Sequence, residues 1–189
     1  MKIEKILLAT SNPGKIREIK SLLPDIEVVL SSDVGLELPE ETGTTFEENA
    51  LIKSEFGFEQ TGIPTLAEDS GLVVDALSGA PGIYSARYEP DPVEAYLRVL
   101  REMEGKTNRA ARFVCVAAFT YSGGSKTFRG TIEGEIAKEP AGEGGFGYDP
   151  IFLFDKVHTT AQISKEEKSK ISHRGKALRE FVGWFTALQ

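Results

Sequence analysis

The feature that most constrains the fold is a pair of long strand-like segments separated by a short glycine-containing turn. Residues 112–121 and 126–137 carry many β-branched and aromatic side chains, and Ser122-Gly123-Gly124-Ser125 lies between them. Turns of this composition join neighbouring strands of a sheet. The sequence therefore predicts a long β-hairpin, against which the rest of the chain has to pack.

Helical and extended patterns alternate along the remainder of the chain. Thr45 and Glu48 have the spacing of a capping box, which predicts a helix over 46–60 that Gly62 ends. The other predicted elements are strands at 3–9, 26–30 and 151–154, two short extended pieces within 64–77, and helices beginning near Pro13, at Pro92 and near residue 175. This order indicates a mixed α/β sheet with flanking helices. No proline-rich or charged linker divides residues 1–189, so one domain with two lobes is expected.

Composition narrows the class of protein. The 189 residues include 22 basic and 29 acidic side chains, which give a formal net charge of −7, and 40% of the residues are hydrophobic. The hydrophobic content argues against a disordered chain, and the acidic balance argues against broad binding to a nucleic-acid backbone. The single cysteine, Cys115, allows no intrachain disulfide and is typical of a reducing compartment. No apolar run is long enough for a signal peptide or a membrane span, so a soluble cytoplasmic protein is expected.

A polar segment, Thr10-Ser11-Asn12-Pro13-Gly14-Lys15, lies where the first predicted strand turns into a helix. Backbone N–H groups at a helix start favour an anion, and Lys15 adds positive charge there. The segment is not a Walker A loop, because Ala9 stands at the first glycine position and Ile16 follows the lysine. An anion site and an ordinary helix start with a solvated lysine both fit the spacing.

Acidic side chains gather in two short segments. Glu40 and Glu41 precede Thr42-Gly43, and Glu68-Asp69 precedes Ser70-Gly71. Mg²⁺ is bound by one or two carboxylates together with phosphate oxygens and water, which such segments supply. Solvated loop acids are the alternative, because spacing alone does not bring Glu40 close to Asp69.

A glycine-rich segment, Gly142 to Pro150, contains Phe146, Tyr148 and Asp149. Glycines let a backbone approach a ligand closely, and the two aromatic rings are suited to stacking on a base. The carboxylate of Asp149 is suited to accept from a base N–H or a sugar hydroxyl. The alternative is a flexible connector, against which the aromatic content argues.

Positive charge is concentrated near the C-terminus. Between Ser164 and Arg179, two acidic side chains accompany six basic ones, which are Lys165, Lys168, Lys170, Arg174, Lys176 and Arg179. On a chain of net charge −7 this predicts a local positive field suited to a small polyanion. A solvated helix face explains some of these lysines but not Ser172-His173-Arg174-Gly175, which is predicted to form a turn before the last helix. Cys115, among apolar strand residues, is predicted to be a core thiol.

Together these segments resemble the Ham1/inosine triphosphatase family, whose members are pyrophosphatases of non-standard purine nucleoside triphosphates. The matching motifs are Thr10-Ser11-Asn12-x-Gly14-Lys15, Glu40-Glu41-Thr42-Gly43, Phe46-x-Glu48-Asn49-Ala50 with Lys53, Asp69-Ser70-Gly71-Leu72, Gly79-Ala80-Pro81-Gly82-Ile83-Tyr84-Ser85-Ala86-Arg87, Gly145-Phe146-Gly147-Tyr148-Asp149-Pro150, and Lys168 with Ser172-His173-Arg174-Gly175. Each motif is weak alone, whereas their order along nearly the whole chain is specific.

The resemblance implies an elongated mixed α/β fold with two lobes around a nucleotide cleft, and a homodimer. It also implies hydrolysis of ITP, dITP and XTP to the monophosphate and pyrophosphate, with Mg²⁺ as cofactor. Purine nucleoside triphosphates are therefore the expected partners, and nucleic acids and membranes are not.

The resemblance assigns site residues position by position. Glu40 and Asp69 would hold the metal, and Asp69 would also be the general base, with Glu41 and Glu68 as alternatives for that role. Glu41 and Lys53 would complete the catalytic set. The nucleotide would be bound by Thr10, Ser11, Asn12, Pro13, Gly14, Lys15, Lys53, Ser70, Phe146, Gly147, Tyr148, Asp149, Lys168, His173 and Arg174.

The chemistry of the side chains agrees with these roles. Lys168 and Arg174 are donors only, so they suit the 6-keto oxygen of hypoxanthine and xanthine and disfavour the 6-amino group of adenine. Sites of this kind discriminate by roughly 10⁴–10⁵-fold. Guanine has the same keto group, and the sequence does not explain its rejection. Two alternatives are a Maf-like nucleotide pyrophosphatase with another base preference, and a non-catalytic nucleotide sensor or nucleic-acid binder.

Overall fold

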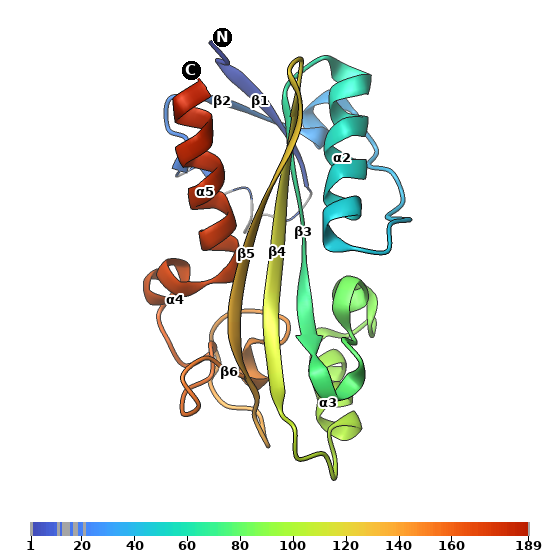
Figure 1. The fold of residues 1–189 in the computed structure, drawn as a ribbon, viewed down its shortest axis with the longest axis vertical. Helices are drawn as coiled ribbons and strands as arrows, with labels where there is room; N and C mark the ends of the chain where they lie inside the picture. Colours follow the sequence, from blue (N-terminus) through green and yellow to red (C-terminus); the bar gives the residue numbers. More distant parts are fainter. Residues whose placement is uncertain (1, 11, 13–15, 17–18, 21, 189) are drawn as a thin grey trace. The chain divides into compact units, whose positions relative to one another are not determined.

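The computed structural model describes residues 2–10, 12, 16, 19–20 and 22–188. Within these residues the strands form one sheet in the order β2-β1-β3-β4-β5-β6 (Figure 1). Strand β1 pairs in parallel with β2 and with β3, whereas β5 and β6 are antiparallel. The predicted mixed α/β sheet with flanking helices is therefore confirmed.

The elements have the following bounds. The strands are β1 (Lys5–Ala9), β2 (Glu27–Leu30), β3 (Thr65–Val74), β4 (Ala110–Tyr121), β5 (Gly124–Ile136) and β6 (Phe152–Leu153). The α-helices are α2 (Phe46–Thr61), α3 (Pro92–Glu102), α4 (Lys165–Ile171) and α5 (His173–Leu188). Short 3₁₀ helices occur at η1 (Ser31–Val34), η2 (Asp75–Leu77), η3 (Gly82–Arg87) and η4 (Asp149–Ile151).

Local signals place several of these elements where the sequence predicts them. The hairpin is present, with β4 and β5 adjacent in the sheet and separated only by Ser122-Gly123. Helix α2 starts at a true capping box, in which Thr45 and Glu48 satisfy each other's backbone N–H groups, and Gly62 ends the helix with a left-handed φ of 68°. Helix α3 begins at Pro92, after the cap of Asp91.

The helix predicted near Pro13 falls partly outside the described residues. Of its residues, Ile16, Ile19, Lys20 and Leu22 are described, and they are helical. The backbone N–H of Ile16 donates to the carbonyl of Asn12 at 3.1 Å, as one turn of helix requires. Ser11, Pro13, Gly14 and Lys15, which were predicted to bind phosphate, lie outside the described residues.

Two predictions from the sequence are wrong. Residues 65–74 form one continuous strand, β3, rather than two extended pieces. Pairing with β1 covers residues 65–67, and β4, the other neighbour of β3 in the sheet, holds the backbone extended beyond them through Ser70-Gly71. Ser172-His173-Arg174-Gly175 is not a turn before the last helix. The hydroxyl of Ser172 accepts from the N–H of Gly175 at 3.0 Å and thereby caps α5, which begins at His173.

The chain divides into two compact units. The first unit comprises Met1–Asp69, Cys115–Arg129 and Ala177–Gln189, and the second comprises Ser70–Val114 and Gly130–Lys176. Each unit has its own cluster of buried apolar side chains. In the described part of the chain, no helix has the length and apolar character needed to cross a bilayer.

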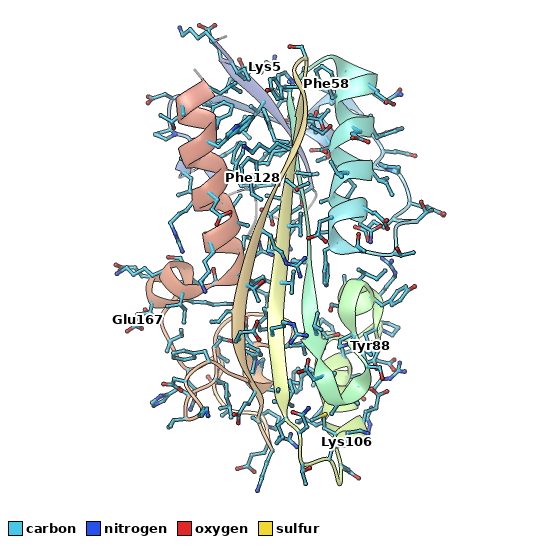
Figure 2. The ribbon with its side chains drawn as sticks, in the orientation of Figure 1. Lys5, Phe58, Tyr88, Lys106, Phe128 and Glu167 are labelled. Atoms are coloured by element: carbon cyan, nitrogen blue, oxygen red, sulfur yellow. The ribbon has the colours of Figure 1, made fainter. Side chains whose placement is uncertain are left out.

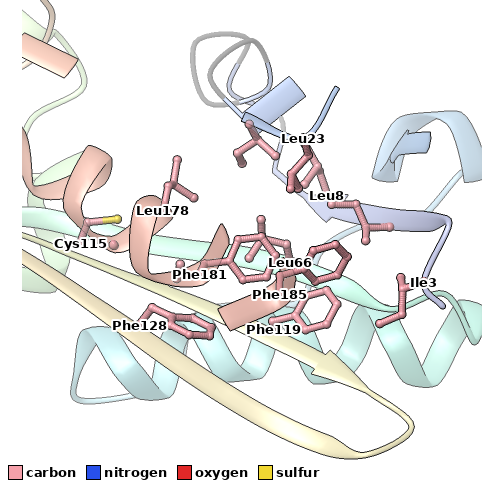
Figure 3. Close-up of a cluster of buried hydrophobic side chains, with 14 residues drawn as sticks. Ile3, Leu8, Leu23, Leu66, Cys115, Phe119, Phe128, Leu178, Phe181 and Phe185 are labelled. Carbon is pink, nitrogen blue, oxygen red and sulfur yellow. The ribbon is translucent and has the colours of Figure 1, made fainter. Parts of the chain in front are cut away.

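In the first unit, α2 and α5 cover opposite faces of the strands (Figure 1). Neighbouring residues of β1 point to opposite faces. Leu8 therefore joins the cluster that contains Phe181 and Phe185 of α5, whereas Leu7 faces α2 next to Gly57. Figure 3 shows the α5 side of this core, in which Phe119 lies beside the rings of Phe181 and Phe185 at centroid distances of 5.2 and 5.6 Å.

In the second unit, α3 packs in one apolar cluster with residues of β3, β4 and β5. Val99 of α3 and Met103, the C-cap residue of this helix, are fully buried with Leu72 of β3. Phe113 of β4 contacts Phe152 of β6 with ring centroids 4.5 Å apart. Figure 2 draws the side chains on this ribbon, with Phe128 labelled in the first unit and Tyr88 in the second. Each unit thus has its own packed apolar cluster.

Candidate active site

The first group of candidate residues is an acid cluster in the first unit, formed by Glu41, Asn49, Lys53, Glu68 and Asp69. Asn49 and Lys53 are four residues apart in α2 and therefore lie on the same face of the helix. That face is directed at β3, where Glu68 and Asp69 are both buried. The helix and the strand together thus bring two of the predicted catalytic side chains, Lys53 and Asp69, to one place.

Lys53 is held by two acceptors. Its ammonium donates to Oε1 of Glu41 at 2.5 Å and to the backbone carbonyl of Glu68 at 2.8 Å. The side chain of Lys53 is 10% exposed and that of Glu41 is 22% exposed, so the ion pair is largely shielded from water. Such shielding strengthens the attraction between the two charges. The structure thus pairs Lys53 with both acidic segments, a contact that the sequence did not predict.

Asn49 connects the two acidic segments that the sequence could not bring together. Its Nδ2 donates to Oδ2 of Asp69 at 3.2 Å, and its Oδ1 accepts from the N–H of Gly43 at 2.8 Å. Asn49 is fully buried. A Cβ on Gly43 would lie 2.7 Å from that same Oδ1, so only glycine allows the loop to approach so closely. One amide therefore ties the Glu40-Glu41 loop to the strand that carries Asp69.

The start of α2 fixes the same loop. Glu48 accepts from the N–H of Thr44 at 2.6 Å and from its hydroxyl at 2.8 Å. These hydrogen bonds, with the N–H of Thr44 first, lower the pKa of Glu48, because they stabilise its charged form. Glu48 is therefore a structural acid, even though it lies close to Glu40 and Glu41 in sequence.

Glu68 is the second buried carboxylate of the cluster. The thiol of Cys115 on β4 lies 3.7 Å from Oε2 of Glu68. Cys115 is buried and carries no disulfide, which confirms it as a core thiol. Glu68 faces the interior of the first unit beside Cys115, whereas its backbone carbonyl holds Lys53.

The metal-ligand prediction rests on Glu40 and Asp69. Asp69 is buried beside Asn49, and Glu40 is exposed in the loop that Asn49 anchors. Among the described residues, no three His, Cys, Asp or Glu side chains form a ready-made metal site. Mg²⁺ fits this chemistry, since it takes one or two carboxylates and completes its shell with phosphate oxygens and water.

Of the predicted phosphate segment the structure describes Thr10 and Asn12, and Thr10 lies level with the acid cluster. In the parallel pairing of β1 with β3, Ala9 lies opposite Ala67. Thr10 therefore follows β1 at the level where Glu68 and Asp69 follow Ala67 on β3. The hydroxyl of Thr10 accepts from the N–H of Asn12 at 3.2 Å, so the chain turns at this point.

The second group of candidate residues is the Asp149 cluster of the second unit, formed by Phe146, Asp149, Thr160, Lys168 and Arg174. Asp149 is 2% exposed, and its carboxylate accepts from the N–H of Phe146 at 2.6 Å and from the hydroxyl of Thr160 at 2.7 Å. The ammonium of Lys168 donates to Oδ2 of the same carboxylate. The structure therefore joins the glycine-rich segment to the basic segment through one buried charge.

Phe146 presents a ring to the cations of the basic segment. Its side chain is 59% exposed, and the ammonium of Lys168 lies 4.7 Å from the ring centroid. The guanidinium of Arg174 lies 5.7 Å from the same ring. His173, next to Arg174, is stacked on Phe113 with centroids 4.9 Å apart and planes inclined by 15°. An exposed aromatic ring with donor side chains beside it is an arrangement suited to a planar, acceptor-rich ligand.

Tyr148 anchors the glycine-rich segment to the segment that carries Ser85. It is buried, and its hydroxyl donates to the backbone carbonyl of Ser85 at 2.9 Å. Burial is the main reason why the pKa of Tyr148 is raised well above its ordinary value. The side chain of Ser85 in turn accepts from the N–H of Leu72 at 2.9 Å. Gly147 precedes Tyr148 with a left-handed φ of 59°, which turns Phe146 and Tyr148 in different directions.

Sequence reasoning missed three supporting residues. Asn49 was recognised only as part of a motif, and its role as a bridge depends on β3 lying beside α2. Ser85 likewise sits in a recognised motif without a predicted contact. Thr160 had no signal at all, because a threonine in an irregular segment resembles any other. Ser70, predicted to bind phosphate, follows Asp69 on β3 and is half-buried.

The fold and the two clusters define an α/β protein with a buried acid cluster in its first unit and, in its second unit, an aromatic ring flanked by cations, a chemistry suited to a nucleotide. Comparison with known proteins gives the family. A sequence model described as the Ham1 family matches residues 6–184, and the chain belongs to that family. The resemblance seen in the sequence is therefore confirmed.

Individual relatives agree with this assignment. A protein of Yersinia pseudotuberculosis named dITP/XTP pyrophosphatase is 46% identical, covering 94% of this chain and 95% of its own. One of the same name from Escherichia coli O157:H7 is 44% identical with the same coverage. Among solved structures, the Ham1 protein of Staphylococcus aureus has a TM-score of 0.92 at 42% identity, covering 98% of this chain and 100% of its own. A structure of a nucleoside-triphosphatase or dITP/XTP pyrophosphatase from Mycobacterium abscessus has a TM-score of 0.79 at 39% identity, covering 94% and 98%.

Proposed function

We propose that this protein hydrolyses non-standard purine nucleoside triphosphates (ITP, dITP and XTP) to the nucleoside monophosphate and pyrophosphate, and so removes them from the nucleotide pool. The observation that carries the proposal is that relatives with this activity in their names align with almost the whole chain. Proteins named dITP/XTP pyrophosphatase align with 94% of the chain at 44–46% identity. A Maf-like pyrophosphatase with another base preference is not favoured by these matches.

The acid cluster supplies the hydrolytic chemistry in this proposal. Asp69 is the general base that takes a proton from the attacking water, with Glu41 and Glu68 as the alternatives. Lys53, tethered by Glu41 and by the carbonyl of Glu68, holds its positive charge ready for the triphosphate. Thr10 to Lys15 and Ser70 bind the phosphates through hydrogen bonds and the charge of Lys15. Catalysis of phosphoryl transfer is mostly positioning and charge stabilisation, which these groups provide.

Mg²⁺ is the proposed cofactor, held by Glu40 and Asp69. When bound, the ion would neutralise phosphate charge and lower the pKa of a coordinated water. The chain's own contribution is to keep Asp69 oriented, and the bond from Asn49 supports that role. The donor set of carboxylate oxygens is the one that Mg²⁺ prefers.

The Asp149 cluster supplies base selection. Phe146 stacks on the purine, Lys168 and Arg174 donate to its 6-keto group, and His173 helps to read the base. Adenine places an amino donor where these side chains also donate, so ATP loses hydrogen bonds at a site built to make them. Unpaired buried donors of this kind reduce kcat/KM by roughly 10⁴-fold.

The test is a panel of ITP, XTP, GTP, ATP and dUTP in the presence of Mg²⁺, with the products identified. We expect pyrophosphate and the monophosphate from ITP and XTP, and much slower turnover of ATP and GTP. We also expect Asp69→Asn to abolish turnover while ITP binding, measured by calorimetry, is retained. Equal rates on ATP and ITP would refute the substrate class, and near-normal turnover by the Asn variant would remove Asp69 as the base.

We further propose that the protein is cytoplasmic and forms a homodimer. Tyr84 and Val93 in the second unit are exposed apolar side chains, 57% and 49% exposed, that a second copy would cover. A single buried cysteine is typical of proteins in a reducing compartment. Sedimentation equilibrium tests the assembly, because a mass of one chain at micromolar concentration would exclude the dimer.

A further inference from the structure

The segment Thr159–Ala161 is hydrogen-bonded to the glycine-rich segment and to the residue that precedes it. The hydroxyl of Thr159 donates to the carbonyl of Ala141 at 2.6 Å, and the N–H of Gly144 donates to the carbonyl of Ala161 at 2.9 Å. Thr160, between them, is 3% exposed, and its N–H donates to the carbonyl of Phe152 at 3.0 Å. The backbone of Thr160 is therefore fixed to β6, and its side chain is aimed at Asp149.

The two oxygens of the Asp149 carboxylate accept hydrogen bonds from different parts of the second unit. Oδ2 receives the N–H of Phe146 and the ammonium of Lys168, which both belong to the proposed base pocket. Oδ1 receives the hydroxyl of Thr160, which belongs to the scaffold. A carboxylate can rotate about the bond that carries it, so a donor on Oδ1 decides where Oδ2 points.

The adjoining loop packs closely against the other oxygen, Oδ2, of Asp149. A Cβ on Gly145 would lie 2.1 Å from Oδ2, and Gly145 has a left-handed φ of 75°. The loop backbone therefore wraps closely around one side of the carboxylate. The Thr160 hydroxyl reaches Oδ1 at 2.7 Å and the backbone carbonyl of Asp149 at 3.3 Å.

We infer that Thr160 is a positioning residue for base selection: by anchoring Asp149, it holds the Lys168 ammonium where it donates to the 6-keto group of the purine. The inference rests on the proposed function for its substrate. Thr160 does not touch the nucleotide, and its effect passes through Asp149 to Lys168. Without its hydroxyl, the buried carboxylate turns toward other donors, and Lys168 loses its fixed place over Phe146.

The central experiment compares two hydroxyl deletions at neighbouring buried threonines. Thr160→Val removes the donor to Asp149, and Thr159→Val removes a donor to a backbone carbonyl of the same region. We expect Thr160→Val to raise KM for ITP about tenfold, to change kcat by less than about threefold, and to reduce the ITP-to-ATP ratio of kcat/KM about tenfold, since a hydrogen bond to a charged group is lost. Thr159→Val is expected to leave KM and this ratio near the wild-type values.

Conservative variants separate positioning from folding. Thr160→Ser keeps the hydroxyl and is expected to restore KM and the ITP-to-ATP ratio. Thr160→Cys keeps a weak donor of similar size and gives an intermediate value, so the test does not depend on how well valine is accepted. A Thr160→Val enzyme with wild-type KM and ratio, or equal changes in the two valine variants, would overturn the inference.

A second readout does not depend on catalysis. Trace labelling with acetic anhydride, followed by mass spectrometry, compares Lys168 with Lys170 in the same protein. The Lys168 side chain is 18% exposed and paired with Asp149, whereas that of Lys170 is 68% exposed. We expect Thr160→Val, and not Thr159→Val, to raise the labelling of Lys168 relative to Lys170 several-fold. If wild-type protein cleaves no purine triphosphate, the proposed function fails, while this ratio still decides whether Thr160 positions Lys168.

Discussion

Replacing Lys53 with methionine tests the acid cluster most directly. Methionine keeps much of the aliphatic stem but removes the ammonium that bonds Glu41 and the carbonyl of Glu68. Removing one partner of a buried ion pair costs about 3–5 kcal/mol, because the other charge is left without compensation. The Glu41 side chain is 22% exposed, so water takes up part of its charge, and the expected loss is about 2 kcal/mol.

The double variant Glu41→Gln with Lys53→Met separates stability from catalysis. Glutamine removes the charge that the single variant leaves behind, so the double variant is expected to recover about 1 kcal/mol of the loss. Turnover of ITP is not expected to recover, because the positive charge near the phosphates is still missing. We expect at least about a 100-fold loss of kcat in both variants.

Urea unfolding followed by the fluorescence of Trp184 measures the stability change. Trp184 is the single tryptophan, and it packs against Phe119 and Phe128 in the core of the same unit as Lys53. A loss below about 0.5 kcal/mol for Lys53→Met would contradict the ion-pair argument. Strictly additive losses in the double variant would contradict the coupling of Lys53 to Glu41, and near-normal turnover would exclude a catalytic role for Lys53.

Two further predictions concern the frameworks of the units. Phe181→Ala, which empties a fully buried position among Phe119, Phe128 and Phe185, is expected to cost about 3–5 kcal/mol in urea unfolding with little change in KM for ITP; a loss under about 1 kcal/mol would contradict the packing. The raised pKa of Tyr148 means that the folded protein retains this proton when the unfolded chain loses it, so stability is complete below about pH 10 and falls as the pH rises further. The urea unfolding midpoint of Tyr148→Phe is therefore expected to change less with pH between pH 9 and 11 than that of the wild-type protein. Parallel pH profiles for the two proteins would refute this role of Tyr148.

Elements defined by short-range contacts could be predicted from the sequence. The capping box of Thr45 and Glu48 and the glycine stop at Gly62 involve residues within one helical turn, and both occur as predicted. The two-residue turn at Ser122-Gly123 is equally local. Continuity of β3 could not be predicted, because Glu68-Asp69-Ser70-Gly71 has the composition of a turn and only pairing with distant strands keeps it extended.

The candidate site likewise has features that the sequence predicts and contacts that it does not. The sequence identifies Asp69, Lys53, Asp149 and Lys168 as polar groups with a purpose, and the family resemblance assigns their roles. It does not reveal that Lys53 bonds Glu41, or that Lys168 bonds Asp149, because each pair joins different elements. Such contacts depend on the distance between a helix and a strand, or between two loops, which no local pattern records.

The two pairs also change how the net charge of −7 is understood. Lys53 and Lys168 are not loose positive charges that attract any anion, because each is already bonded to a carboxylate of its own unit. A buried pair holds the ammonium in one position, so much of the entropy cost of ordering a long side chain is met before a ligand binds. The pairing also weakens the long-range field that would draw in a nucleic-acid backbone. A ligand then gains binding free energy from these lysines only if it places an acceptor at a fixed point. This geometry favours recognition of one small molecule over general binding of polyanions.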